Sequence, residues 1–95
     1  MHQQQSPAFV VVGEIDMATT EQLRRSLERH VATSHGDVVI DCNEMSFIDS
    51  SGIKVLLDVA AAARTQGRGF VATNVGPNCR RTLHMAGVDL LLGIS

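Results

Sequence analysis

Three short apolar runs, each followed by a segment with helical spacing, constrain what this chain can fold into. The runs cover residues 8–12, 38–40 and 70–72, and β-branched valine and isoleucine dominate the first two. Continuous apolar runs of this length are typical of strands that are buried on both faces. Alternation of such strands with helices favours parallel pairing and right-handed crossovers. The sequence therefore predicts an α/β domain with a small, mostly parallel sheet.

The segments that follow the runs predict three helices. Thr19 followed by Gln22 has the spacing of a capping box at the start of the first helix. The apolar face of this helix is expected to comprise Leu23, Leu27 and Val31. A second helix is expected to begin near Ser50, and a third at Pro77, because proline is well tolerated at the first helical position. Residues 88–94 are interpreted as a last short strand or an extended tail.

Composition excludes several classes of protein. Hydrophobic residues make up 44% of the chain, which is typical of a globular domain and not of a disordered one. The formal net charge of -2 argues against a nucleic-acid binder, which usually carries a basic excess. No apolar run approaches the roughly 20 residues of a membrane helix, so no membrane partner is expected. Two cysteines, Cys42 and Cys79, are too few for a disulfide framework, which favours a reducing, cytoplasmic location.

The polar start of the chain is expected to be a flexible extension. Residues 1–7 lack the basic-then-apolar pattern of a signal peptide. The remaining length suits one domain with a modest aliphatic core. We therefore expect a flexible start over residues 1–7 and a single domain over residues 8–95.

Acidic side chains follow the first two predicted strands. Segments that leave parallel strands emerge at one edge of the sheet, where open α/β folds place their sites. Half of the ten acidic residues are expected to gather at this edge: Glu14, Asp16, Asp41, Glu44 and Asp49.

The segment Asp49-Ser50-Ser51-Gly52 lies where a predicted strand gives way to a helix. Free backbone N–H groups at a helix start favour an anion, so a phosphoryl group on a serine here would gain hydrogen bonds. The carboxylates of Asp49 and Asp16 would repel the same group. Gly52, which has no side chain, would let a partner's backbone approach closely. The alternative is that Ser50 or Ser51 only caps the helix.

Catalytic and metal-binding constellations are missing from the sequence pattern. A nucleophilic serine needs a base held by a third group, and none of the four histidines has an evident path to Ser50. Neither a glycine-rich phosphate loop nor a metal-ligand spacing is present. We therefore expect that the protein is not an enzyme and binds no cofactor or metal. Cys42 and Cys79 are interpreted as reduced core residues, with a redox switch as the alternative.

The order and spacing of three elements resemble the STAS domain family. Residues 13–16 (G-E-I-D) are similar to its first element, residues 47–52 (F-I-D-S-S-G) to its second, and residues 85–88 (M-A-G-V) to its third. The resemblance runs from about residue 8 to residue 94 and implies a sheet with helices mainly on one face. Compared with the family, the chain is short at both ends, since the usual first strand and final helix are missing. An open sheet edge would result, which makes a homodimer a further hypothesis.

The D-S-S-G form resembles bacterial anti-sigma factor antagonists in particular. In that branch, an anti-sigma factor with serine kinase activity phosphorylates the first serine of the motif. The unphosphorylated antagonist binds this kinase and frees the sigma factor, and a phosphatase reverses the modification. The resemblance implies that Ser50 is the phosphoacceptor, that Asp16 lies next to it, and that Asp49, Ser51 and Gly52 complete the docking edge. ATP would bind to the partner.

A second branch of the family supplies the alternative function. The short STAS subunits of ABC-type phospholipid transport complexes also lack the final helix. Those subunits usually carry Thr and Gly after the aspartate, whereas Ser50 and Ser51 follow it here. The serine pair therefore favours sigma-factor regulation.

Overall fold

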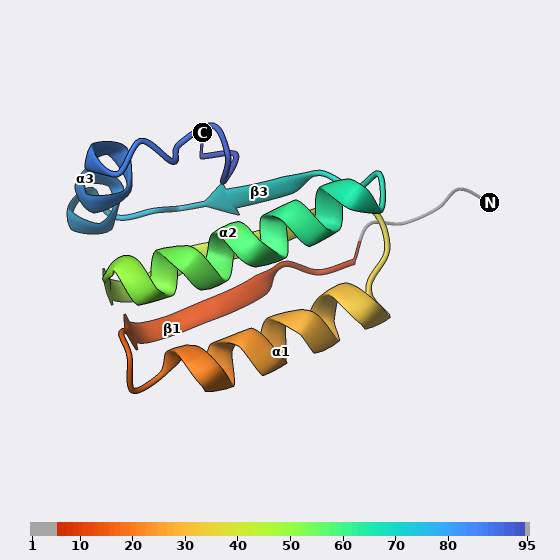
Figure 1. Cartoon of the computed structure of the whole chain (residues 1–95), viewed down its shortest axis with the longest axis horizontal. Helices are drawn as coiled ribbons and strands as arrows, with labels where there is room; N and C mark the ends of the chain where they lie inside the picture. Colours follow the sequence, from red (N-terminus) through yellow and green to blue (C-terminus); the bar gives the residue numbers. More distant parts are fainter. Residues whose placement is uncertain (1–5, 95) are drawn as a thin grey trace.

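Strands and helices alternate strictly in the computed structural model, which describes residues 6–94 (Figure 1). The elements are β1 (Phe9–Ile15), α1 (Thr20–Thr33), β2 (Val38–Ile48), α2 (Ser50–Thr65), β3 (Phe70–Thr73) and α3 (Pro77–Met85). The strands form one sheet in the order β1-β2-β3, and both pairings are parallel. The predicted α/β class with a small parallel sheet is confirmed.

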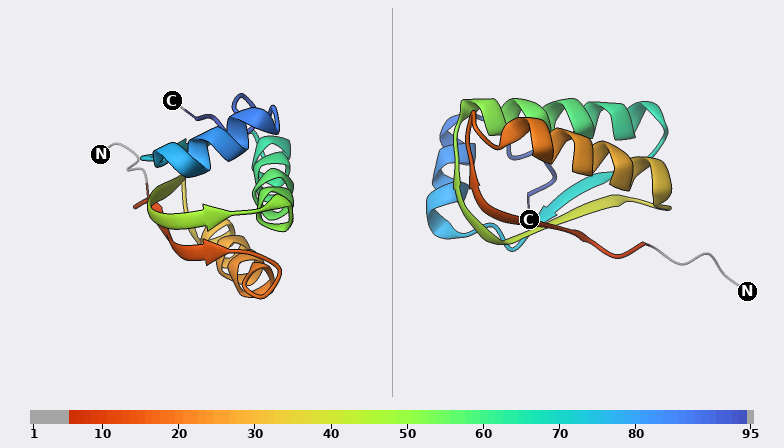
Figure 2. Two further views of the ribbon diagram at one scale, coloured as in Figure 1. Left: turned by 90° about the vertical axis from the view of Figure 1, so that its left-hand side faces the viewer. Right: turned by 90° about the horizontal axis from the view of Figure 1, so that it is seen from below.

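Two helices cover one face of the sheet. Figure 2 shows α1 and α2 side by side on the same side of the strands. Their apolar faces and the inner faces of the strands form a single aliphatic core. In α1 the buried residues are the three predicted ones: Leu23, Leu27 and Val31. In α2 the buried face comprises Gly52, Ile53, Val55, Leu56, Val59, Ala60 and Ala63.

α3 takes the place that β3 leaves empty beside the second half of β2. β3 pairs with β2 only from Val38 to Asp41. Beyond that point α3 packs against β2, and the Cys79 thiol donates a hydrogen bond to the Met45 carbonyl over 3.7 Å. Burial of Leu83 on the same helix fits this contact, because long apolar side chains then point toward the sheet.

β2 is longer than the sequence suggested, and this corrects the predicted acidic cluster. Two register shifts against β1 place extra residues in β2 and let the strand continue through the polar segment 41–44. Asp41 lies within the strand, where its carboxylate accepts hydrogen bonds from Asn74 and Asn43. It precedes Asp49 by eight residues, about 26 Å along an extended strand. Asp41 therefore does not belong to the edge that carries Asp16 and Asp49.

The chain after α3 is not the predicted strand or extended tail. Residues 88–94 form successive turns, with Leu92 donating its N–H to Val88 and Ile94 donating to Asp89. Leu92 is fully buried, and its carbonyl accepts a single hydrogen bond from Ala72 of β3. Gly93 permits this arrangement because it adopts a positive φ of 60° and lies against the Phe70 backbone. Leu92 thus packs at the edge of β3 without pairing as a strand, whereas Leu90 and Leu91 are exposed.

The predicted flexible start falls mainly on residues outside the described part of the chain. Within that part, the His35 N–H donates to the Ser6 hydroxyl over 2.8 Å, and the Ser6 N–H donates to the His35 carbonyl over 3.4 Å. The division at residue 7 therefore stays a prediction. No helix within residues 6–94 has the length and apolar character that spanning a bilayer requires.

Candidate functional site

The loops after β1 and β2 meet at the carboxyl end of the sheet. Ile15 and Ile48 are the last paired residues of the two strands. One residue later, the Asp49 N–H donates to the Ile15 carbonyl over 3.1 Å. The parallel ladder thus extends into the loops and brings Asp16 beside Asp49 and the first turn of α2. The backbone thus places these two predicted site residues at the same end of the sheet.

Asp49 caps α2, and this corrects the alternative that a serine does so. Its Oδ1 atom accepts hydrogen bonds from the Ser51 N–H at 2.9 Å and the Gly52 N–H at 3.2 Å. The Ser51 hydroxyl donates to the same oxygen over 2.6 Å. The hydrogen bond from this hydroxyl, followed by the two from the backbone, lowers the pKa of the Asp49 carboxyl below its ordinary value. Asp49 takes this role because its backbone is already extended and held by Ile15.

Ser50 and Ser51 differ in how far their hydroxyl groups are available. Ser50 is the first helical residue and is exposed, and its hydroxyl has no hydrogen-bond partner among residues 6–94. Ser51 is half-buried, and its hydroxyl is bound to Asp49. Of the two serines, Ser50 therefore offers the hydroxyl that an approaching partner can reach.

Asp16 lies in a tight loop that Thr19 organises. The Asp16 N–H donates to the Thr19 hydroxyl over 3.0 Å, and that hydroxyl donates to the Glu14 carbonyl over 2.9 Å. The Asp16 carboxylate accepts the Ala18 N–H over 2.9 Å. Thr19 is the N-cap residue of α1 by position, but its side chain makes no cap hydrogen bond. The predicted capping box with Gln22 is therefore wrong, because the hydroxyl holds the Asp16 loop instead.

Gly52 is buried, and the packing of α2 on the sheet requires a glycine there. A Cβ atom at this position would lie 2.6 Å from Ile15 Cγ2 and 2.9 Å from Ile48 Cγ1. Real Cβ atoms do not approach other atoms so closely, so any side chain would push α2 away from the strand ends. Contact between Gly52 and a partner remains a prediction.

Two exposed apolar side chains near the site were not predicted from the sequence. Met17, 81% exposed, follows Asp16 directly, and Phe47, 47% exposed, lies two residues before Asp49. Large apolar residues that stay exposed beside polar groups are frequent in contact surfaces. The signal available in the sequence was a methionine in an otherwise polar loop.

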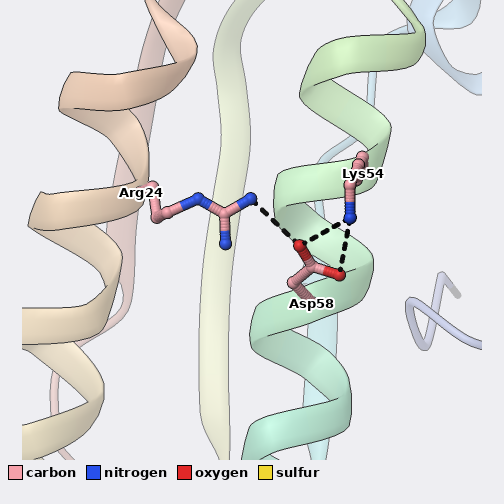
Figure 3. Close-up of polar contacts among 3 residues, drawn as sticks. All are labelled: Arg24, Lys54 and Asp58. Atoms are coloured by element: carbon pink, nitrogen blue, oxygen red, sulfur yellow. Dashed lines mark hydrogen bonds and ion pairs between the residues drawn. The ribbon is translucent and has the colours of Figure 1, made fainter.

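A cluster of three charged side chains, Arg24 of α1 with Lys54 and Asp58 of α2, links the two helices (Figure 3). Asp58 accepts a hydrogen bond from Arg24 of α1 over 3.0 Å and one from Lys54 over 3.2 Å. The hydrogen bond from Arg24, then the one from Lys54, lowers the pKa of the Asp58 carboxyl. The spacing of Lys54 and Asp58 could have been recognised in the sequence as an i,i+4 pair, whereas the link to Arg24 depends on how the helices pack.

Neither a metal site nor an acid–base dyad accompanies Ser50 in the described structure. Within residues 6–94, no group of three or more His, Cys, Asp or Glu side chains is arranged to hold a metal ion. His30 packs against the ring of Phe9, and His84 lies 3.1 Å from Asp89.

A family model and a relative of known description are both similar to this chain. The model described as "Mlab, STAS domain" matches residues 1–93. The anti-sigma-F factor antagonist RsfB of Mycobacterium tuberculosis is 33% identical over 79 residues, which cover 81% of this chain and 62% of that protein. The present chain thus spans less than two thirds of this relative's length.

Two solved structures resemble the fold. An anti-sigma factor antagonist from Mycobacterium paratuberculosis matches with a TM-score of 0.68 and 35% identity, over 90% of this chain and 72% of that one. The anti-sigma factor antagonist SpoIIAA in its unphosphorylated form matches with a TM-score of 0.75 over 97% of this chain and 86% of that one. Its identity is 18%, so this second match concerns the fold alone.

Proposed function

The chain belongs to the STAS domain family, and from this premise we propose that it is an anti-sigma factor antagonist controlled by phosphorylation of Ser50. In its unphosphorylated form it binds an anti-sigma factor with serine kinase activity and so releases a sigma factor. The named relatives support the antagonist role, because RsfB and the Mycobacterium paratuberculosis protein, at 33% and 35% identity, are both described as anti-sigma factor antagonists. The protein acts as a binding module in the cytoplasm and leaves catalysis to its partners.

The observation that carries this proposal is that Asp49, and not Ser50, caps α2. Asp49 supplies the cap of α2, so the Ser50 hydroxyl is exposed and is not needed for helix stability. Ser51, by contrast, is held by the Asp49 carboxylate. An acceptor serine has to enter a kinase active site, and Ser50 can do so without breaking a hydrogen bond of the fold.

The switch works through charge. The kinase transfers the γ-phosphoryl group of ATP: a bond forms between phosphorus and Ser50 Oγ, the bond to the β-phosphate oxygen breaks, ADP leaves, and the hydroxyl proton passes to a base on the kinase. The phosphoserine adds about -1.5 to -2 charges at pH 7 beside Asp16 and Asp49. Interfaces that fit the uncharged hydroxyl then carry an unpaired anion, and binding weakens. A phosphatase restores the hydroxyl by hydrolysis to inorganic phosphate.

The docking edge consists of Asp16, Asp49 and Ser51 around Ser50, with Gly52 holding α2 against the sheet beneath them. Met17 and Phe47 add apolar contact area beside these polar groups. A combination of exposed apolar anchors and a polar rim is typical of protein–protein contacts. Neither nucleic acid nor a membrane is part of the proposed mechanism.

Mass spectrometry of the protein isolated from its native host, both growing and stressed, tests the proposal. The expected result is a single phosphoryl group on Ser50 whose occupancy changes with condition. A matched Ser51→Ala variant should still be phosphorylated, since the acceptor is the preceding serine. Absence of phosphate under every condition would contradict the proposal. Co-purification of an ATPase subunit, with indifference to Ser50→Ala, would then favour the phospholipid-transport alternative.

A further inference from the structure

Lys54 lies one helical turn after Ser50 on the exposed side of α2. Residues four apart on a helix share a face, and side chains lean toward the helix N-terminus. The Lys54 side chain is 73% exposed, so no packing holds its ammonium group in place. A phosphoryl group on Ser50 would therefore come within reach of this cation.

The present partner of Lys54 holds it only weakly. Asp58 follows Lys54 by four residues, and an acid that follows a lysine at this spacing stabilises a helix less than one that precedes it. Asp58 also has a second cation, because Arg24 of α1 binds it over 3.0 Å (Figure 3). If Lys54 moves away from Asp58, the Asp58 carboxylate thus keeps Arg24 as its partner.

We propose that Lys54 is the internal counter-ion of the phosphorylated state, and that phosphorylation of Ser50 draws its ammonium group from Asp58 to the phosphate. This inference rests on the proposed function, in which Ser50 is the phosphoacceptor. The new pair has the favourable order, with the anion N-terminal to the cation and close to the positive end of the helix. Asp58 stays bound to Arg24, so the link between α1 and α2 survives the switch.

The charges around the phosphate explain why a counter-ion is needed. Asp49 caps the same helix and Asp16 follows Ile15, whose carbonyl accepts the Asp49 N–H, so two carboxylates belong to the end of the sheet where the anion is added. Lys54 is the cation that α2 itself provides at this end, while Arg24 on α1 is already engaged by Asp58. Pairing with the phosphate would also bring the Lys54 ammonium group toward the docking edge, where it offsets part of the added negative charge.

The test uses the full chain with phosphoserine installed at position 50 during translation, which requires no kinase. A ³¹P NMR titration measures the second pKa of the phosphate, which is about 6 for free phosphoserine. A nearby cation favours the dianion and lowers this pKa, so Lys54→Gln should raise it by about 0.2 to 0.4 unit. Lys54→Arg should restore the original value. Arg29→Gln serves as the matched control, since it removes an exposed cation from α1 two and a half turns beyond its start.

The side-chain ¹⁵N resonance of Lys54 gives a second readout. It should change when Ser50 is phosphorylated, and this change should depend on the ionisation of the phosphate. A Lys54→Gln titration that coincides with the parent or with Arg29→Gln would overturn the inference, as would an unchanged Lys54 resonance. Native-host mass spectrometry decides separately whether Ser50 is the natural acceptor. If the proposed function is wrong, Ser50 should carry no phosphate in the host. If the counter-ion proposal is wrong, the Lys54→Gln substitution should leave the titration of the installed phosphoserine unchanged.

Discussion

The backbone N–H of Asp49 donates to the carbonyl of Ile15 over 3.1 Å and so continues the β1–β2 ladder one step beyond the strands. This single contact fixes the loop after β2 against the loop after β1. It also orients the Asp49 carboxylate toward the free N–H groups of α2. The position of Ser50 next to Asp16 therefore depends on the pairing of two strands as much as on the helix that carries it.

Removal of the cap should destabilise the protein. Asp49→Ala takes away the acceptor of the Ser51 and Gly52 N–H groups. The expected effect is a fall in melting temperature of about 4–8 °C, as the loss of one typical cap produces in a domain of this size. Asp49→Asn keeps an acceptor and should show a smaller fall. Equal melting temperatures for the parent and Asp49→Ala, measured by circular dichroism, would refute the capping role.

Acid should weaken the fold through the same carboxylates. The pKa of Asp49 is lowered chiefly by the Ser51 hydroxyl, that of Asp58 by Arg24, and that of Asp41 by the Asn43 N–H. A carboxyl with a lowered folded-state pKa stabilises the protein above its unfolded value of about 3.9, and this contribution disappears as pH falls through the folded value. These carboxyls should therefore make the urea midpoint decline as the pH falls below about 4. A midpoint that rises in this window would contradict the assignment.

Gly52→Ala should destabilise the protein even though alanine is the better helix former. The added Cβ would meet Ile15 Cγ2 at 2.6 Å, and both Ile15 and Ile48 are buried too tightly to turn away. Overpacking of this kind costs about 1–3 kcal/mol. Gly76→Ala adds a Cβ atom without overpacking, because nothing lies within 4 Å of the position that this atom would take, so only the weaker capping of α3 by alanine should cost stability. Urea unfolding of both variants gives the comparison, and equal stabilities would disprove the packing requirement.

Local chemistry made much of the fold predictable from the sequence. Pro77 follows Gly76 at the start of α3, and Gly87 closes its end with a positive φ of 74°, as the residue types suggest. The three apolar residues of α1 are buried because their spacing matches one helical face. These signals involve residues close in sequence, so no knowledge of tertiary packing was needed to interpret them.

The errors concern positions where distant segments decide. Asp49 and Ser50 are both good cap residues, and only the hydrogen bond to Ile15 selects Asp49. Asp41 seemed to leave a strand, but burial of Cys42 and Met45 against the core keeps the polar segment in β2. Local patterns contain none of these tertiary constraints.

The two cysteines should be unreactive in the folded protein. Both are buried free thiols, and burial raises the pKa of Cys42 to about 12, with smaller contributions from the Asp41 carboxylate and Cys79. Burial raises the pKa of Cys79 as well. At pH 8 the thiolate of Cys42 is roughly a thousandfold scarcer than in an unfolded chain, so iodoacetamide should not modify it. Denaturation should expose both thiols to iodoacetamide. Equal labelling before and after unfolding would contradict this prediction and favour the redox switch.

Substitutions at Ser50 should separate binding from modification. Ser50→Ala removes the acceptor oxygen but leaves the cap intact, so it should bind the anti-sigma factor kinase like the parent and resist phosphorylation. Ser50→Asp places a carboxylate beside Asp16 and Asp49 and should weaken binding at least tenfold, about 1.4 kcal/mol, without unfolding the domain. Calorimetric titration with the kinase from the native host measures both affinities. Circular dichroism verifies that each variant is folded. If Ser50→Ala and Ser50→Asp bound equally well, charge at this position would not control the interaction, and the proposed switch would be wrong.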